Sequence, residues 1–523
     1  MTKKENHLKL VMAGLMLGIF IAAMDQTIVA TAMGTIVADL GGLDKFVWVT
    51  SAYLVAEMAG MPIFGKLSDM YGRKKFFLFG IAVFLLGSIL SGTAESITQL
   101  SIYRAIQGIG GGALMPIAFA IIFDVYPAEK RGQMSGIFGA VFGMSSLFGP
   151  LLGAYITDNI SWHWIFYINL PLGLLALALL HFSYHESHEH SKQKIDWSGA
   201  ATLVGAVVSL MFALELGGKT YAWDSAAIIG LFAAFAILFT CFLFIERKAA
   251  EPIISFRMFK HRLFAVTNLV ALMFTIPFIV ATVFIPIYIQ GVFGGTATNS
   301  GLLLLPMMLG MVAASVSGGI LANKISYRNI MVMAVLFLLA GVSLLSTLTT
   351  ETPRYLVTIY MIITGFGTGF SFSVLSMAAI HKFKLSEYGS ANSTIAFVRE
   401  FGMTVGITIY GTIQSHLFFG KLTDIFAGFG QSGQAEAFKN PRVMLSPEAR
   451  EHIPPQVLEQ MTTALSSTIA KTFMWSLIPA VIAFACIWFM GGESLGEKMK
   501  QMRAEQAEKR KQVVGQPQPG KLQ

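Results

Sequence analysis

The chain has 523 residues, of which 54% are hydrophobic and only 13% are charged, and its net charge is +8. This composition excludes an ordinary soluble domain, in which about a quarter of the residues are charged. The basic residues are not interleaved with aromatic ones, so we expect no nucleic-acid partner. The cysteines, Cys241 and Cys486, fall within apolar runs and indicate neither a disulfide nor a metal site.

Fourteen apolar stretches of about 20 residues follow one another along the chain, and each is long enough to cross roughly 30 Å of hydrocarbon as a helix. The first follows the segment KKENHLK and is not followed by a small-residue cleavage site, so we interpret it as an uncleaved span. The sequence therefore predicts an all-α polytopic membrane protein with 14 transmembrane helices. The predicted spans are residues 10–33, 46–66, 74–93, 98–124, 133–157, 162–183, 198–217, 225–245, 263–290, 299–322, 329–349, 355–380, 390–417 and 471–491.

The Lys and Arg residues are distributed unevenly between the two sides of this topology. With both termini on one side, 27 of the 37 lie on that side, 8 lie on the other side and 2 lie within spans. Positive charge accumulates in the cytoplasmic loops of membrane proteins. We therefore expect a multi-pass protein of the plasma membrane with both termini in the cytoplasm.

An internal repeat relates the two ends of the chain. A shift of 257 residues superposes IYRAIQGIGGG (102–112) on IYMIITGFGTG (359–369). Two six-helix halves in the same orientation, which meet at a central cavity, form one large class of secondary transporters. The predicted units are a first half at 1–190, two inserted linker helices at 191–262, helices 9–13 at 263–417, an external loop at 418–470, helix 14 at 471–492 and a basic cytoplasmic tail at 493–523.

The two halves differ in their charged residues. A charge near the centre of a membrane helix costs about 2.5–3.5 kcal/mol on insertion scales, so each charge needs either a buried partner or a function. Matching positions of the first and second halves are Arg104 and Met361, Asp69 and Asn323, and Gly143 and Glu400.

Five segments together resemble a known family. They are MDQTIVATAMG (24–34), GKLSDMYGRKKFF (65–77), LSIYRAIQGIGGGA (100–113), FGPLLG (148–153) and WHWIFYINLPLG (162–173). They resemble the signatures of the major facilitator superfamily and, taken together, those of its fourteen-span drug:proton antiporter branch, which performs multidrug efflux. The resemblance covers essentially the whole chain and implies the major facilitator fold.

The segment after the second span combines two glycines with an acid and a base. Gly72 permits a tight turn, and Asp69 can accept hydrogen bonds from Arg73 or from a helix N-terminus. The resemblance implies a conformational latch of Gly65, Asp69, Gly72 and Arg73, in which Asp69 meets the start of span 13 and holds the outward-facing state. A purely topogenic role would explain the basic residues of this segment but not the acid.

The fifth span contains a motif of small residues. Gly149 and Gly153 leave one helix face without side chains, while Pro150 removes a backbone hydrogen bond and bends the helix. The resemblance implies an antiporter motif, which disfavours proton leak and marks exporters. Ordinary small-residue packing is the alternative.

Two charged residues are predicted at similar depth in the outer half of the membrane. Asp25 lies roughly 22 Å from the cytoplasmic start of span 1, and Arg104 lies roughly 9 Å from the external start of span 4. Asp25 and Arg104 can therefore form a pair. The family mechanism implies a role for this Arg in proton coupling, and a purely structural ion pair is the alternative.

Two further acids, Glu57 and Glu400, fall near the midplane, where transporters bind their substrates. Tyr53 lies four residues before Glu57, and Phe397 lies three residues before Glu400, so each acid has an aromatic neighbour. A carboxylate beside an aromatic ring suits a lipophilic cation. The alternative is an acid that is satisfied by a hydroxyl group or by Arg399 and does not contact substrate.

These features predict a bacterial proton-coupled antiporter that exports lipophilic, cationic drugs or toxic compounds by alternating access. We expect small-molecule substrates, protons and membrane lipids as partners, no enzymatic activity, no cofactor and no metal, and we favour a monomer. The histidines of HFSYHESHEH (181–190) lack a partner cluster, and no phosphate-binding glycine loop with its lysine is present. A lipid or lipid-linked-sugar flippase and a non-transporting membrane sensor are the alternatives.

Overall fold

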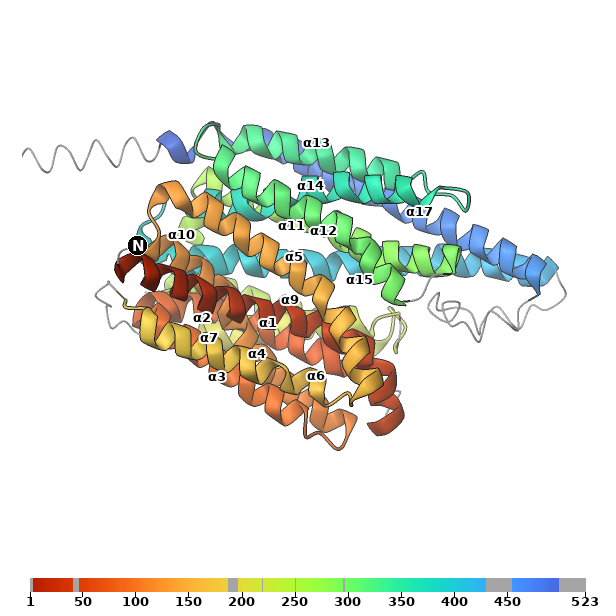
Figure 1. Ribbon diagram of the computed structural model, residues 1–523, viewed down its shortest axis with the longest axis horizontal. Coiled ribbons are helices and arrows are strands. Elements are labelled where there is room, and N and C mark those ends of the chain that lie inside the picture. The colour runs from red at the N-terminus through yellow and green to blue at the C-terminus, as the bar shows by residue number, and fades with distance from the viewer. Residues whose placement is uncertain are drawn as a thin grey trace, which may run out of the picture.

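Long helices make up nearly all of the computed structural model, and no β-strand occurs among the residues it describes, which are 3–40, 47–186, 196–218, 220–249, 251–294, 297–428 and 454–497 (Figure 1). The α-helices are α1 (Lys3–Leu40), α2 (Val47–Tyr71), α3 (Arg73–Ser91), α4 (Ile97–Val125), α5 (Ala128–Asn159), α6 (Trp164–Tyr167), α7 (Asn169–Ser183), α8 (Trp197–Leu216), α9 (Ala226–Lys248), α10 (Phe256–Phe259), α11 (Arg262–Phe293), α12 (Ala297–Leu321), α13 (Tyr327–Leu345), α14 (Arg354–Ala379), α15 (Tyr388–Gly428) and α17 (Pro455–Ile487). Two short 3₁₀ helices, η1 (Leu385–Glu387) and η4 (Trp488–Met490), complete the described elements.

Each predicted span coincides with a helix, and the sixth span is divided between α6 and α7. Within the described residues, twelve segments are long and apolar enough to cross a membrane. The helices α2 and α15 are not among them. Both are long enough, but α2 carries Glu57 and Lys66, and α15 carries Arg399 and Glu400. The crossing by these two helices, and hence the total of fourteen, remains a prediction.

The largest difference from the prediction concerns the external loop expected at 418–470. Helix α15 continues to Gly428 and α17 already begins at Pro455, so both ends of this segment are helical. Helical hydrogen bonds do not depend on apolar side chains, and a helix can therefore continue beyond its hydrophobic stretch. The Lys421 ammonium and the Ser467 hydroxyl (Nζ–Oγ 2.6 Å) join the two extensions. The rest of this loop, residues 187–190 of the histidine tract and the tail after 497 lie outside the described residues.

The helices form two groups that run along the long axis of the molecule (Figure 1). The first group (α1 to α7) and the second group (α11 to α17) correspond to the two halves of the repeat. Helices α5 and α12 pack together across the boundary between the halves, and so do α2 and α15. The linker helices α8 and α9 pack against each other and, through α8, against α2.

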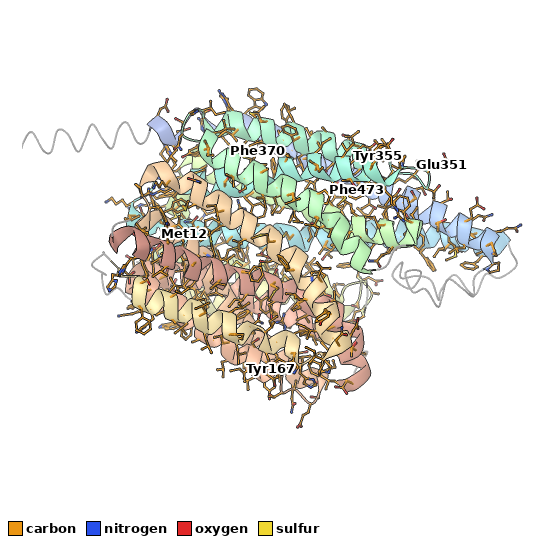
Figure 2. All side chains as sticks on the ribbon, in the orientation of Figure 1. Met12, Tyr167, Glu351, Tyr355, Phe370 and Phe473 are labelled. Carbon is orange, nitrogen blue, oxygen red and sulfur yellow. The ribbon has the colours of Figure 1, made fainter. Side chains whose placement is uncertain are left out.

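Burial separates inner helices from outer ones. In an apolar stretch of 18 residues within α4, 83% of the residues are buried, whereas the corresponding share in α9 is 11%. The exposed surface of α9 is also apolar, with Ile229, Ile237 and Phe244 among its exposed side chains. Side chains fill the spaces between helices, as Met12 does, and also cover the outside of the bundle, as Tyr355 does (Figure 2). An apolar outer surface is what a lipid environment requires.

Candidate functional site

The Asp25 and Arg104 side chains form an ion pair between α1 and α4. Neither residue is exposed. Arg104 Nε also donates to the carbonyl oxygen of Val49 (3.3 Å), and its guanidinium lies over the Tyr53 ring, 4.2 Å from the ring centroid. The structure thus brings together the two residues that the sequence predicts at similar depth.

Three polar residues that the sequence analysis did not single out complete this network. Gln107 Nε2 (2.8 Å) and Asn169 Nδ2 (2.9 Å) both donate to Asp25 Oδ1. Ser88 Oγ accepts from the same Asn169 nitrogen (3.0 Å). Gln107 Oε1 in turn accepts from Arg104 Nη1 (2.6 Å). Gln107 lies three residues after Arg104 in an apolar helix, and this polar pair on one helix face was the available clue.

Tyr53 and Glu57 lie beside this network on α2. A Glu57 carboxylate oxygen accepts from Gln26 Nε2 of α1 (2.7 Å), and the residue is 4% exposed. The Tyr53 hydroxyl is buried and has no hydrogen-bond partner in the described part of the chain. The Tyr53 ring, which we expected to face substrate, instead contacts Arg104.

A cavity lies between the two halves, and the Glu400 carboxylate belongs to its wall. Among the described residues, no hydrogen-bond donor reaches the Glu400 side chain. The wall combines aromatic and thioether side chains with a few polar groups. It is formed by Met115 and Phe119 of α4, Thr275 of α11, Phe372 and Ser376 of α14, and Asn392, Ile395, Ala396, Arg399, Glu400 and Met403 of α15.

Two of the predicted substrate-binding residues do not belong to the wall of this cavity. Glu57 is absent from the wall of this cavity, and so is Phe397. The Phe397 ring stacks on Phe401 (centroids 6.4 Å apart) and packs towards the linker helices. Residues three positions apart are rotated by about 60° around a helix, which is enough to separate Phe397 from the face of Glu400. Phe372 and Phe119 provide the aromatic walls instead.

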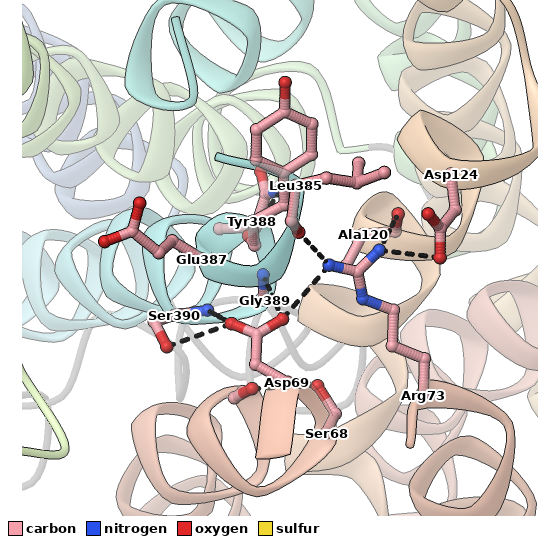
Figure 3. Close-up of polar contacts among 12 residues, drawn as sticks. Ser68, Asp69, Arg73, Ala120, Asp124, Leu385, Glu387, Tyr388, Gly389 and Ser390 are labelled. Carbon is pink, nitrogen blue, oxygen red and sulfur yellow. Dashed lines mark hydrogen bonds and ion pairs between the residues drawn. The ribbon is translucent and has the colours of Figure 1, made fainter. Parts of the chain in front are cut away.

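The predicted latch joins the end of α2 to the start of α15 (Figure 3). The backbone N–H groups of Gly389 (2.9 Å) and Ser390 (2.7 Å) donate to the two oxygens of Asp69, and the Ser390 hydroxyl donates as well (3.0 Å). A carboxylate at a helix N-terminus satisfies free N–H groups and interacts favourably with the helix dipole. Contacts of this kind tie the two halves together at one end of the bundle.

Arg73 extends this contact to two further segments (Figure 3). Its guanidinium pairs with Asp69 (3.1 Å) and with Asp124 of α4 (2.8 Å), and it donates to the carbonyl oxygen of Leu385 in η1. Burial, followed by the nearby Asp124 carboxylate, raises the pKa of the Tyr184 phenol, which donates to Asp124 (3.4 Å). Asp124 was not singled out from the sequence.

The glycines of this segment have different steric roles. Gly72 connects α2 to α3 with φ of 117°, in a region that favours glycine. Gly65 lies where α2 approaches α15, and a Cβ atom there would collide with Ser393. The close approach of these two helices therefore depends on the absence of a side chain at Gly65.

The predicted antiporter motif packs α5 against α1. A Cβ atom at Gly149 would collide with the Thr27 hydroxyl, and one at Gly153 would collide with the Thr31 hydroxyl. Pro150 lies within the same helix. The two glycines, one helical turn apart, therefore allow a close contact between α1 and α5.

No group of three or more His, Cys, Asp or Glu residues in the described part of the chain is arranged to hold a metal ion.

Comparisons with known proteins agree with this architecture. The model of the Major Facilitator Superfamily matches residues 15–407. Multidrug resistance protein 3 of Bacillus subtilis is 56% identical over 94% of this chain and 96% of its own length. Multidrug transporter protein MdtP of the same organism is 35% identical over 98% of both chains.

Solved structures of low sequence identity share the fold. The proton:xylose symporter XylE has a TM-score of 0.58 and 13% identity, and the match covers 95% of this chain and 99% of that one. A bacterial homologue of the lysosomal transporter Spinster has a TM-score of 0.56 and 15% identity, with 94% and 98% covered. The chain therefore belongs to the major facilitator superfamily, as a multi-pass membrane transporter of its drug-efflux branch.

Proposed function

We propose that this protein is a proton-coupled antiporter, which exports lipophilic cationic compounds across the plasma membrane of a bacterium. The observation that carries the proposal is the Glu400 carboxylate, which faces the cavity between the two halves without a hydrogen bond from any described residue. An ionisable group inside a membrane bundle is costly and typically marks a substrate or ion pathway. The names of the two Bacillus relatives support drugs as the substrate class.

The walls of the cavity suit a lipophilic cation. Phe119 and Phe372 offer aromatic faces to a positive charge, while Met115 and Met403 provide flexible, polarisable surface. Glu400 then supplies the opposite charge. A wall of this kind accepts differently shaped molecules, as expected for an exporter of many compounds.

Asp25 and Arg104 are the proposed proton-coupling pair. Tyr53 lies under the Arg104 guanidinium, and Glu57 lies one helical turn further along α2. Protonation of Asp25 would remove the charge that Arg104 pairs with, which links proton uptake to the packing of α1 against α4. The membrane potential supplies about 2.3 kcal/mol per charge per 100 mV.

Alternating access requires that one end of the cavity is closed while the other is open. From the distribution of basic residues, we expect the end of α2 and the start of α15 to lie on the cytoplasmic side. The contacts of Asp69 and Arg73 then close the cytoplasmic entrance, and the close packing at Gly149 and Gly153 limits proton leak between α1 and α5. We expect the protein to work as a monomer in contact with membrane lipids.

Everted membrane vesicles with an acidified lumen test the proposal. Addition of ethidium, a permanent cation, should raise the luminal pH in vesicles that contain the protein, because each exported cation is exchanged for protons. Vesicles without the protein and vesicles with Asp25→Asn serve as controls. A wild-type response no larger than that of the controls would contradict the proposal. Movement of a fluorescent phospholipid between the two leaflets that is faster than in vesicles without the protein would instead identify a flippase.

A further inference from the structure

Arg399 belongs to the wall of the same cavity as Glu400 but does not pair with it. In the described chain, no carboxylate forms an ion pair with the Arg399 guanidinium. The residue is only 8% exposed, and its guanidinium lies 4.9 Å from the centroid of the Phe372 ring. The cavity therefore contains one positive and one negative group, each without a protein counter-ion in contact.

The guanidinium retains hydrogen-bonding capacity. It donates to the carbonyl oxygens of Ser371 (3.0 Å) and Phe372 (3.4 Å) and to the Ser376 hydroxyl (3.4 Å). A guanidinium has five N–H groups, so these three acceptors leave two for another partner. An oxyanion is the partner that binds a guanidinium most strongly, through short charge-assisted hydrogen bonds.

A second polar group in the wall lacks a partner. The Asn392 side chain donates through Nδ2 to the carbonyl oxygen of Tyr388 (2.9 Å). Its Oδ1 atom is buried and accepts no hydrogen bond from the described residues, and the residue is 2% exposed. A buried polar atom without a partner costs free energy, which a bound molecule with an N–H or O–H group would recover.

We propose that this cavity recognises zwitterionic amphiphiles, with the cationic group of the substrate at Glu400 and its oxyanion at Arg399. The proposal rests on the proposed function and adds the anionic half of the recognition. The apolar body of such a molecule would contact Phe119, Met115 and Met403. Arg399 is then a specificity-determining residue, which selects molecules that carry an acid as well as a base.

A pair of dyes that differ in one group tests this role. The two probes are a rhodamine with a free carboxylate, which is zwitterionic at neutral pH, and its methyl ester, which is a cation of nearly the same shape. Their binding to the purified protein in lipid nanodiscs is measured by fluorescence anisotropy, for the wild type, Arg399→Gln and Arg399→Lys. Lys421→Gln is the charge-matched control, because it removes a positive charge from the same helix about 33 Å away.

Arg399→Gln should weaken binding of the zwitterion about tenfold or more and change binding of the ester less than about twofold. Arg399→Lys should retain part of the preference for the zwitterion over the ester, and Lys421→Gln should bind both dyes as the wild type does. Unchanged ester binding by Arg399→Gln shows that the variant is folded. Equal weakening of both dyes, or of neither, would overturn the role of Arg399.

Glu400→Gln separates this inference from the proposed function. Weaker binding of both dyes by Glu400→Gln supports the cation site on which the inference depends. Unchanged ester binding by Glu400→Gln would contradict the proposed cation site itself. If Glu400→Gln weakens ester binding but Arg399→Gln changes the binding of both dyes equally, the zwitterion inference alone is overturned.

Discussion

The Asp25 carboxylate lies among one charged and two neutral donors, Arg104, Gln107 and Asn169. Loss of one partner of a buried ion pair typically costs about 3–5 kcal/mol, because the other charge remains buried. An asparagine at this position keeps the shape and one acceptor oxygen but cannot carry a proton. Asp25→Asn therefore removes the proton site and also weakens the support of Arg104, and substrate exchange without a pH gradient distinguishes the two effects.

We expect Asp25→Asn to abolish proton-driven export of every substrate, whatever the charge of that substrate, because the proposed coupling group is lost. Exchange of substrate down its own gradient should persist. Initial efflux rates with and without a pH gradient measure both effects. Asp39→Asn is the control on the same helix, where the carboxylate accepts from Trp162 (2.8 Å) outside this network. Equal gradient-driven export by Asp25→Asn and wild type would remove Asp25 from the proton path.

Glu400→Gln should act selectively, because only charged substrates interact with the carboxylate. We expect a loss of roughly tenfold or more in export of a dication, a smaller loss for a monocation and little change for a neutral lipophilic dye. Efflux rates of the three dyes, at matched expression, measure this order. Glu57→Gln should lack the dication effect, since Glu57 is bonded to Gln26 outside the cavity wall. A uniform loss for all three dyes would assign Glu400 to coupling or folding.

At the scale of elements, the contact between α1 and α5 depends on missing side chains. Gly149→Ala introduces a Cβ atom against the Thr27 hydroxyl. Overpacking of this kind typically costs about 1–3 kcal/mol. We expect a lower midpoint of thermal unfolding in detergent and slower transport, both partly restored by Thr27→Ala.

Gly411→Ala is the matched control for this prediction, because no atom lies within 4 Å of a Cβ at that position. Replacement of a helical glycine by alanine normally stabilises by about 0.5–1 kcal/mol. Gly149→Ala with the stability and transport rate of Gly411→Ala would show that the helices separate without cost. Close packing of α1 against α5 would then not explain the predicted antiporter motif.

At the scale of the whole molecule, we propose that the contacts of Asp69 with α15 bias the equilibrium between two arrangements of the halves. Asp69→Asn removes the charge that Arg73 and the start of α15 stabilise. Every 1.4 kcal/mol lost from one arrangement changes the population ratio tenfold. We expect slower transport with nearly unchanged dye binding, because the latch lies outside the cavity. Export rates and binding affinities of the same dye test the separation.

Glu251→Gln is the control for the latch, because it breaks the nearby Lys66–Glu251 pair (2.6 Å), whose side chains are partly exposed. An exposed pair contributes about 0–1 kcal/mol, so transport should change little. Wild-type transport by Asp69→Asn would show that the segment acts in membrane topology alone.

Much of this architecture could be predicted from the amino-acid sequence. Apolar stretches long enough to cross a membrane identified the positions of the helices, and the repeat divided them into two halves. The charges Asp25, Arg104 and Asp69 stood out because each is costly in an apolar span or at its end. Their contacts in the bundle follow from depth and from the resemblance to a known family.

The direction in which each side chain faces emerged only in the folded bundle. Phe397 turns towards the linker helices, Glu57 is bonded to Gln26, and Arg399 lines the cavity. A soluble helix reveals its inner face by its polar residues, but a membrane helix is apolar on its lipid face as well. Its rotation is decided by close packing with neighbouring helices. The sequence therefore predicted which residues are polar within the membrane, and packing decided which of them meet.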